Sequence, residues 1–324
     1  MWDSVPWFIE GGAEHTSEVA RLLAYTAVGG AEGIVGSADL RVQPLTSPAA
    51  AVQLMTGACA ITNRAPGATA QSYVARLPVA EQVPVAATGV SPRSDLVIAR
   101  IENPYSQGES WPLPANPKVG PYVSTRIISG VPNTTTDIRQ VRPGDSAITL
   151  ARIDLPANTS SVTGAMITDL RDMVSPRRER RLYPLFAAET DGITAEDDRW
   201  YDWPKIARIN VKVPSWATRY TVMTTVCGLK FDHANVRAGM VHQLGGIWGE
   251  HTEIDDNGGL YARRQTVIIA HSKDIPASMR GTVQPLYIKT IMFKTHTGDM
   301  YVDEATAIVH DVEWQEAPTL DPGL

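Results

Sequence analysis

A short run of acidic residues is the first place where this sequence could hold a ligand. Between residues 242 and 264, the letters EIDDNG put four side chains at positions 1, 3, 5 and 6 of a calcium-binding loop: Glu253, Asp255, Asn257 and Gly258. The twelfth position of such a loop supplies a bidentate glutamate, whereas this sequence has Arg264 there. A tight hairpin explains the same letters, since asparagine and glycine tolerate a positive φ. We therefore favour a hairpin over a calcium loop and expect no metal site.

The same stretch contains a tryptophan that could contact a partner. Its glycines make a regular buried strand through its middle improbable, and its polar residues would be costly to bury unpaired. We expect an exposed loop or hairpin from His242 to Arg264, at one end of a β-domain. An exposed indole can anchor a protein partner or stack on a sugar ring, and we favour the protein partner. The candidate contact residues are Trp248, His251, Glu253, Asp255 and Asp256.

A cluster of arginines marks a second site of interest, in a chain with a formal net charge of −6. The letters RRERR supply Arg177, Arg178, Arg180 and Arg181, and acidic residues follow as far as Asp198. Such a region can neutralise itself or a neighbouring copy, so we predict an inter-module or inter-subunit salt network, with a solvated linker as the alternative. Neither half of the chain has the basic excess that binds nucleic acid, and we expect no such partner.

Motifs for catalysis are missing from the sequence. It has no nucleophile elbow, no Walker loop, no dinucleotide-binding glycine pattern and no metalloprotease helix motif. None of the seven histidines lies three or four residues from another, and Cys59 and Cys227 are isolated from each other. We therefore expect no cofactor and no enzyme. Paired carboxylates of a glycosidase cannot be recognised without geometry, so that possibility stays open.

The elements that must position these residues fall into two modules. Residues 14–27 have the apolar spacing of a helix, and short β segments follow at 51–62, 71–77, 83–90 and 122–130. The segments 94–104 and 146–156 resemble each other and have largely apolar middles, which predicts two central strands of one sheet, covered on both faces. Residues 159–172 fit a short helix or an extended segment. This predicts an α+β module over residues 1–176, with one clear helix and an antiparallel-rich sheet.

The rest of the chain contains no helical pattern and is dominated by strand patterns. Residues 177–199 show no sustained period and predict a charged linker. Strand patterns then recur at 207–214, 219–231, 263–272, 281–294 and 305–316, with a hairpin turn near 295–300. Residues 200–324 are therefore predicted to form an all-β sandwich of jelly-roll type. The N-terminal letters MWDSVPWFIEGG lack the pattern of a signal peptide, and no apolar run is long enough to span a membrane.

Four segments of the first module resemble the N-terminal module of minor tail proteins from long-tailed phages of actinobacteria. They are GGAEHTSEVARLLAYTAVGGAEGIVGSADLRV (11–42), SDLVIARIENPY (94–105), GPYVSTRIISGVP (120–132) and AITLARIDLPANTSSVTGAMITDLRDMVSPRRERRLYP (147–184). The resemblance covers residues 8–184 and fades after Pro184, where such proteins diverge into different C-terminal modules. It transfers no catalytic residue.

The resemblance implies a virion protein of the tail tip or baseplate, made in the bacterial cytoplasm. Its N-terminal module would attach to other tail-tip proteins, and its β-sandwich would face outward, with host attachment as one role. The resemblance also implies a homo-oligomer, a trimer above all, and the segment with Trp2 and Trp7 offers apolar groups to a neighbour. A lectin-like protein that binds host cell-wall glycan is the first alternative, and a glycan depolymerase is the second.

Overall fold

The structure is a computed structural model of the 324-residue chain, and it describes residues 14–106, 108, 111–194, 197–232, 234–259 and 261–319. These residues form two compact units. The first contains the chain up to Ser175 together with Pro318 and Thr319, and the second runs from Pro176 to Ala317. The second unit is thus inserted into the chain of the first. Trp2 and Trp7 lie outside the described residues.

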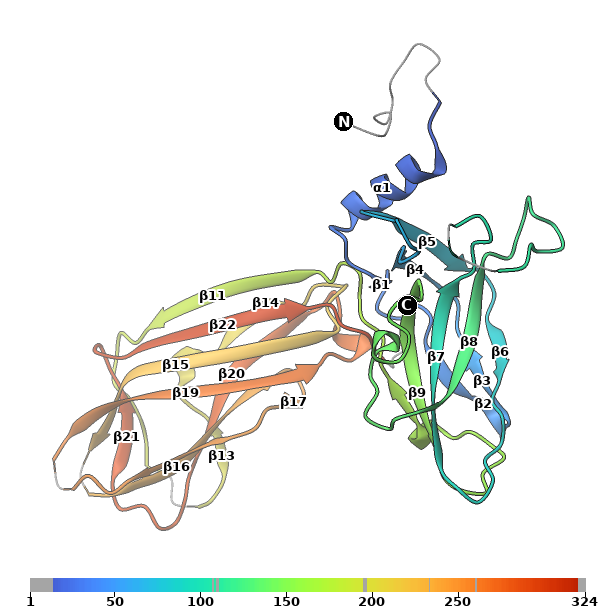
Figure 1. Ribbon diagram of the computed structural model, residues 1–324. Coiled ribbons are helices and arrows are strands. Elements are labelled where there is room, and N and C mark those ends of the chain that lie inside the picture. The colour runs from blue at the N-terminus through green and yellow to red at the C-terminus, as the bar shows by residue number, and fades with distance from the viewer. Residues whose placement is uncertain are drawn as a thin grey trace. The chain divides into compact units, whose positions relative to one another are not determined.

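Three antiparallel sheets make up the first unit (Figure 1). One has the order β1-β4-β5, from β1 (Gly33–Ile34), β4 (Gly57–Thr62) and β5 (Ser72–Leu77). The second has the order β2-β3-β6, from β2 (Val42–Ala49), β3 (Ala51–Leu54) and β6 (Glu81–Pro84). The third has the order β10-β9-β7-β8, from β7 (Arg93–Ile101), β8 (Val123–Val131), β9 (Ala147–Leu155) and β10 (Ile167–Asp169). Short 3₁₀ turns lie at η1 (Ile138–Gln140) and η2 (Gly164–Met166).

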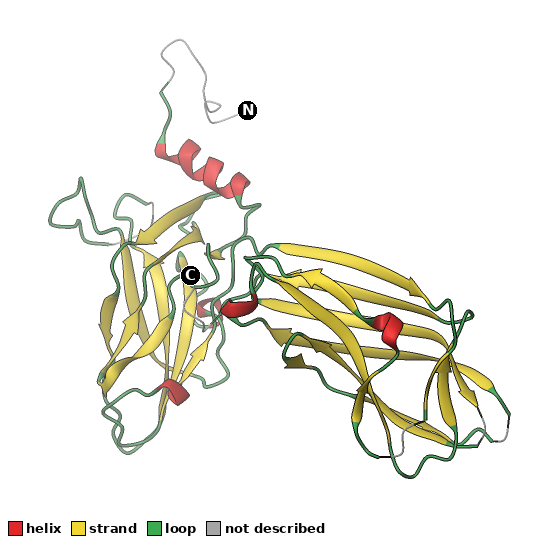
Figure 2. Ribbon diagram, turned by 180° about the vertical axis from the view of Figure 1, so that it is seen from behind, coloured by secondary structure: helices red, strands yellow, loops and turns green. Residues whose placement is uncertain are grey.

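The predicted helix is confirmed as α1 (Ser17–Ala27), the longest red ribbon in Figure 2. It is the single α-helix among the described residues, since the other helical segments are 3₁₀ turns. It buries Val19 and ends at Ala27, shortly before Gly29 and Gly30, which both have positive φ. Arg21 attaches the helix to β5, because its guanidinium donates to the Gln71 side chain at 2.6 Å and lies 5.3 Å from the centre of the Tyr73 ring.

The prediction for the two similar segments is also confirmed. They form β7 and β9, which pair directly with each other from Arg93–Leu155 to Arg100–Ala147. β7 is buried almost from end to end, as expected for a strand with both faces covered. The segment 51–62, expected as one strand, divides into β3 and β4. Residues 159–172, for which a short helix and an extended segment were both open, contain the 3₁₀ turn η2 and the strand β10.

One buried arginine closes the first unit. The side chain of Arg171 is fully buried, and each of its five N–H groups donates a hydrogen bond. Two go to the Asp169 carboxylate at 2.9 and 2.6 Å, two go to the carbonyls of Ser37 and Asp39, and one goes to the carbonyl of Thr319 at 3.1 Å. The guanidinium thereby joins three separate parts of the chain.

Two six-stranded antiparallel sheets form the second unit. The first has the order β11-β22-β15-β21-β12, with β19 also paired to β15: β11 (Arg178–Phe186), β12 (Asp191–Ile193), β15 (Arg219–Asp232), β19 (Arg263–Asp274), β21 (Asp299–Val302) and β22 (Ala307–Gln315). The second has the order β13-β20-β16-β17, with β14 on β20 and β18 on β16: β13 (Trp200–Asp202), β14 (Ile209–Lys212), β16 (Val236–Leu244), β17 (Ile247–Trp248), β18 (Thr252–Asp256) and β20 (Val283–Met292). Turns η3 (Lys205–Ala207) and η4 (Ala277–Met279) complete it.

Alternation along the long strands places the core between these two sheets. In β22, and in β15 as far as Val226, every second residue is buried, among them Val312, Trp314 and Val222. These side chains pack with residues of the other sheet, such as Leu244 and Leu286. The period of two that predicts a strand in the sequence is thus the period of burial in the structure.

The charged linker predicted for residues 177–199 is wrong. Its first part is β11, which pairs with β22 over nine residues, and β12 follows at Asp191–Ile193. The prediction failed because β11 is an edge strand whose residues are mostly exposed, so it lacks an alternating apolar pattern. Residues 295–300, predicted as a turn, similarly include the start of β21.

A chain of hydrogen bonds crosses the core of the second unit. It runs from a phenol to a main-chain carbonyl through Tyr220, His271, His242, Thr224, His310 and Ala207. The successive donor–acceptor distances are 2.9, 3.2, 2.6, 2.5 and 2.8 Å. All three imidazoles are buried, so each ring nitrogen needs a partner within the protein.

One arrangement of neutral imidazole rings gives every donor and acceptor in this series of hydrogen bonds a partner. His310 must donate from Nε2 to the carbonyl, so its Nδ1 accepts from the Thr224 hydroxyl. The hydroxyl then accepts from Nε2 of His242, whose Nδ1 accepts from Nδ1 of His271. Nε2 of His271 finally accepts from the Tyr220 hydroxyl. An extra proton on any of these rings breaks this order, which is a physical reason for keeping all three neutral.

We expect acid to destabilise the second unit through this chain. Burial lowers the pKa of His271 to about 4 and lowers the pKa of His242 and His310 as well. A histidine with a lowered folded-state pKa stabilises the protein above its unfolded pKa, and this contribution is lost as the pH falls from about 6.5 towards 4. For His271, the loss between pH 7.5 and pH 5 is about 2 kcal/mol.

Urea unfolding at pH 7.5 and pH 5 tests this expectation. His271→Gln should show a smaller loss of unfolding free energy between the two pH values than the wild type. His251→Gln, which replaces an exposed histidine, should retain the wild-type loss. Equal pH dependence in the wild type and His271→Gln would contradict the proposed role of the chain.

Candidate functional site

Trp248 lies in β17, at the edge of the second sheet, and its side chain is 43% exposed. It pairs across the strands with Gln243, and the neighbouring residues His242 and Leu244 point into the core. Trp248 is therefore on the outer face of this sheet. The stretch from His242 to Arg264 is not a single loop, because it includes the end of β16, the two strands β17 and β18, and the start of β19.

The structure surrounds Trp248 with residues from distant parts of the chain. Its ring meets the Trp200 ring edge to face, with 6.0 Å between the centres, and Trp200 meets His251 in the same way at 6.0 Å. The Lys289 ammonium lies 5.4 Å from the centre of the Trp248 ring and forms an ion pair with Asp202 at 2.5 Å. We call Trp200, Trp248, His251, Lys289 and Asp202 the aromatic platform.

Neighbouring groups hold the platform in place. Gly239 leaves room for the Trp200 ring, since a Cβ atom on this glycine would lie 3.2 Å from it. Asp202 also accepts from Arg208 at 2.9 Å, and the Arg208 guanidinium stacks 4.4 Å from the centre of the Tyr287 ring. The platform thus offers indole surface beside charged groups whose positions are fixed, which suits a sugar ring or a protein side chain.

The predicted contact residues do not all share this surface. His251 and Glu253 are exposed and lie 3.7 Å apart, and Asp255 is exposed on β18. Asp256 is wrong as a contact residue, because only 6% of it is exposed. Its carboxylate accepts from Arg263 and from the backbone N–H of Gly258, and the bond from Arg263 is the main cause of its lowered pKa.

These contacts bear on the calcium-loop alternative. Asp256 is occupied by Arg263, and Asn257 donates to Asp255, so the acidic side chains point to different partners. Among the described residues, no group of three or more histidine, cysteine or acidic side chains is placed to hold a metal ion. The predicted DNGG hairpin is also wrong, because β18 pairs with β16 in one sheet and β19 pairs with β15 in the other. The Asp256–Arg263 ion pair instead joins the last residue of β18 to the first residue of β19.

Each of the four clustered arginines contacts an acidic residue of the second unit. Two of these contacts reach across to β22: Arg178 to Glu313 at 3.9 Å, and Arg180 to Asp311. A third joins Arg177 to Glu316, the residue after β22, at 2.5 Å. The fourth joins Arg181 to Glu179 at 2.5 Å within β11. The described contacts are thus pairs within one unit and not between units. A network to a neighbouring copy stays a prediction.

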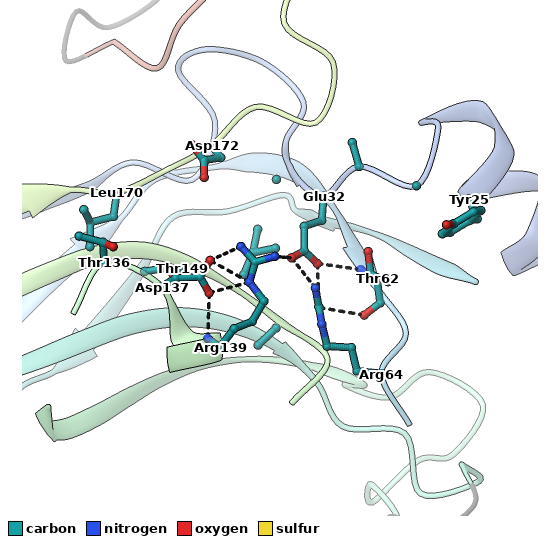
Figure 3. Close-up of a pocket in the computed structure, with 15 residues that line it drawn as sticks. Tyr25, Glu32, Thr62, Arg64, Thr136, Asp137, Arg139, Thr149, Leu170 and Asp172 are labelled. Carbon is teal, nitrogen blue, oxygen red and sulfur yellow. Dashed lines mark hydrogen bonds and ion pairs between the residues drawn. The ribbon is translucent and has the colours of Figure 1, made fainter. Parts of the chain in front are cut away.

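The first unit has a pocket of about 370 Å³ whose lining is rich in charge (Figure 3). Glu32 points between two arginines: it accepts from Arg64 at 2.6 and 2.8 Å and lies 3.4 Å from Arg139. Arg139 also pairs with Asp137, and this pair lowers the pKa of the Asp137 carboxyl. Because these charges neutralise one another, the network joins the residues before β1 to β4 and η1, and we assign it a structural role.

Sequence reasoning missed most of the aromatic platform. Trp200, Asp202 and Lys289 lie far from Trp248 along the chain, and only strand register brings them together. A signal existed at Trp200, which starts a short polar segment where a buried tryptophan is less expected. The spacing of the residues along the chain could not show that the side chains of Trp200 and Trp248 lie on the same face of the second sheet.

Asp255 and Asp256 provide a matched pair of variants. We expect Asp256→Ala to lower the unfolding free energy by about 2–4 kcal/mol, because it leaves Arg263 without its buried partner. Asp255→Ala should cost less than about 0.5 kcal/mol, since this residue is exposed. Urea unfolding at neutral pH measures both. Similar losses in the two variants would show that Asp256 is not a structural residue.

A scan against protein-family models and a search of curated proteins gave no match for this chain. Two solved structures of infectious bursal disease virus are similar to it at low TM-scores. The VP2 subviral particle has a TM-score of 0.26 and 11% identity, covering 93% of this chain and 83% of that chain, and the T13 viral particle has 0.25 and 12%, covering 93% and 81%. The insecticidal delta-endotoxin Cry8Ea1 of Bacillus thuringiensis has 0.18 and 6%, covering 88% and 51%. Similarities at these TM-scores assign neither a fold nor a function to this chain.

Proposed function

We propose that this protein is a structural component of a phage virion, placed at the tail tip and made in the host cytoplasm. The observation that carries the proposal is the match between the sequence resemblance and the division of the chain. Residues 8–184 resemble tail-tip proteins, and the longer of the two chain segments that form the first unit ends at Ser175. The shared module therefore corresponds to a compact unit, and the resemblance fades within β11, soon after the second unit begins.

In this role the first unit attaches to other tail-tip proteins and the second unit is presented outward. Attachment requires a stable fold and no catalysis, and we propose that the protein is not an enzyme. As part of the same proposal, the strands of the second unit are connected in the order of a jelly roll. No helix among the described residues is long and apolar enough to cross a membrane.

Purified virions test the role directly. We expect the protein to remain with particles through density-gradient purification, and antibodies against the second unit to label the tail tip in electron micrographs. Phage carrying an interrupted gene should lose the label and serve as the control. Particles that contain no copy of the protein would refute the proposal.

Sugar binding by the second unit is the second candidate, favoured by the aromatic platform. Exposed indole surface beside Lys289 and Asp202 matches the apolar face and the hydroxyl groups of a sugar ring. We expect Trp248→Ala to abolish binding of the protein to purified host cell-wall glycan. Tyr261→Ala removes another exposed aromatic ring, at a site outside the platform, and should bind as the wild type does.

The readouts also separate the remaining alternatives. If Trp248→Ala binds the glycan as well as the wild type does, the aromatic platform is not a sugar site. A protein partner is then the remaining ligand class for the platform. Release of soluble sugar by the wild type would indicate a depolymerase.

Self-association is part of the proposed role, with a trimer expected from the resemblance. The sheet face described below favours a pair instead, and a mass measurement decides between them.

A further inference from the structure

The outer face of the first sheet of the second unit carries exposed apolar side chains. Leu182, Phe186, Met223 and Ile268 are 60%, 68%, 41% and 53% exposed. They come from three strands, yet strand register places them on one surface: Leu182 and Met223 both pair with Asp311, and Ile268 pairs with Thr225. We call the surface formed by Leu182, Pro184, Phe186, Met223, Ile268 and Val309 the apolar face. Asp311 and Thr225 lie between these apolar residues on the same surface. Exposed apolar side chains gathered on one face of a sheet are typical of an interaction site.

The edge of the same sheet is protected against pairing, in contrast to its face. β11 is the last strand of the sheet and is nine residues long, so its free edge could add a strand from another molecule. It carries four charged residues and Pro184, which are features that protect natural edge strands. Association by edge pairing is therefore disfavoured at β11, whereas β19, which pairs only with β15 among the described strands, forms another edge of the sheet. Stacking on the face is the mode that the exposed apolar side chains favour.

The size of the face fits a dimer contact. Four strands spaced at about 4.8 Å, over nine residues of about 3.4 Å each, give roughly 590 Å² for the whole outer face of the sheet on each molecule, its charged rows included. Two such faces would bury about 1,200 Å², which exceeds the roughly 1,000 Å² expected of a specific interface. Stacking a second sheet on this face would follow the same geometry as the sheet packing inside a β-sandwich.

The charges at one end of the face indicate what the partner is. Arg178 on β11 and Asp274 on β19 lie in one row across the sheet, joined through Gln315 and Arg219. Their side chains are 68% and 77% exposed, and each also has a partner within the chain: Glu313 lies 3.9 Å from Arg178, and Arg219 lies 2.9 Å from Asp274. A two-fold axis parallel to the strands, between β22 and β15, places β11 of one copy over β19 of the other. Arg178 of each copy then faces Asp274 of the second copy, so the surface is complementary to itself.

The same axis matches large side chains with small ones. Ile268 lies in the row of Pro184, and Leu182 lies in the row of Ala270, at opposite sides of the sheet. The axis therefore sets Ile268 over the second copy's Pro184 and Leu182 over the second copy's Ala270. From the size, charge and shape of the apolar face, we propose that it binds a second copy of this chain in a two-fold stack. This association does not depend on the virion role.

The oligomeric mass of the full chain tests the proposal. We expect the wild type to sediment as a dimer at micromolar concentration, and Ile268→Glu to raise the dissociation constant at least tenfold by burying a charge in the contact. Val283→Glu is the matched control: Val283 is 61% exposed on β20 in the other sheet, so this variant should remain a dimer. Thermal unfolding of Val283→Glu should match the wild type, since this side chain is exposed. Ile268→Glu should match the wild type at protein concentrations low enough for both to be monomers, because dimer formation itself stabilises the folded wild type.

A thiol cross-link tests the two-fold arrangement itself. Cys227 is exposed beside the apolar face, whereas Cys59 is buried and burial raises its pKa to about 12, so a maleimide reacts at Cys227. The axis puts the two Cys227 residues of a dimer about 11 Å apart, from one strand spacing and one sheet spacing. A short bis-maleimide should therefore join wild-type dimers and fail to join Ile268→Glu.

Three outcomes would overturn the proposal. A wild-type protein that sediments as a monomer has no such contact, and a trimer is incompatible with a two-fold stack. A dimer that Ile268→Glu leaves intact, or that the Cys227 cross-linker cannot join, uses another surface. Because none of these measurements involves virions, they separate the failure of this association from the failure of the virion role.

Discussion

The guanidinium of Arg171 is the group on which the closure of the first unit depends, because every one of its five N–H groups is used by the protein. A buried arginine without partners would be strongly destabilising, and Asp169 supplies both the charge and the bidentate geometry that offset its desolvation. The other acceptors are carbonyls of Ser37, Asp39 and Thr319, which are far apart in the sequence. A single side chain thus determines where the chain must return after the second unit.

The second unit solves a related problem in a different way. Its core includes polar groups, yet they are ordered in a hydrogen-bonded chain from Tyr220 to His310 in which each donor has one acceptor. While this hydrogen-bonded chain is satisfied inside the unit, the two outer faces differ from each other. One carries the aromatic platform with its fixed charges, and the other carries apolar side chains bordered by arginine–carboxylate pairs. Sugar or protein contact on the first face and self-association on the second are therefore compatible in one molecule.

Prediction from sequence succeeded where burial controls the amino-acid pattern. β7 and β9 have continuous apolar middles, and α1 has an apolar stripe, so each was predicted in the right place. β16 was missed because Gly239 makes room for an aromatic ring from another strand and His242 takes part in the hydrogen-bonded chain. β11 was taken for a linker because an exposed edge strand needs no alternation. The platform and the apolar face depend on strand register, which a single sequence does not contain.

The insertion of the second unit has a consequence for the history of the gene. β11 and β22 are neighbouring strands, and Arg178 pairs with Gln315, so the chain enters and leaves the unit one strand spacing apart, about 5 Å. Any domain whose ends lie equally close could take its place by recombination, without disturbing the acceptors around Arg171. The first unit would then be inherited unchanged while its insert is exchanged, as long as the returning chain still delivers the carbonyl of Thr319.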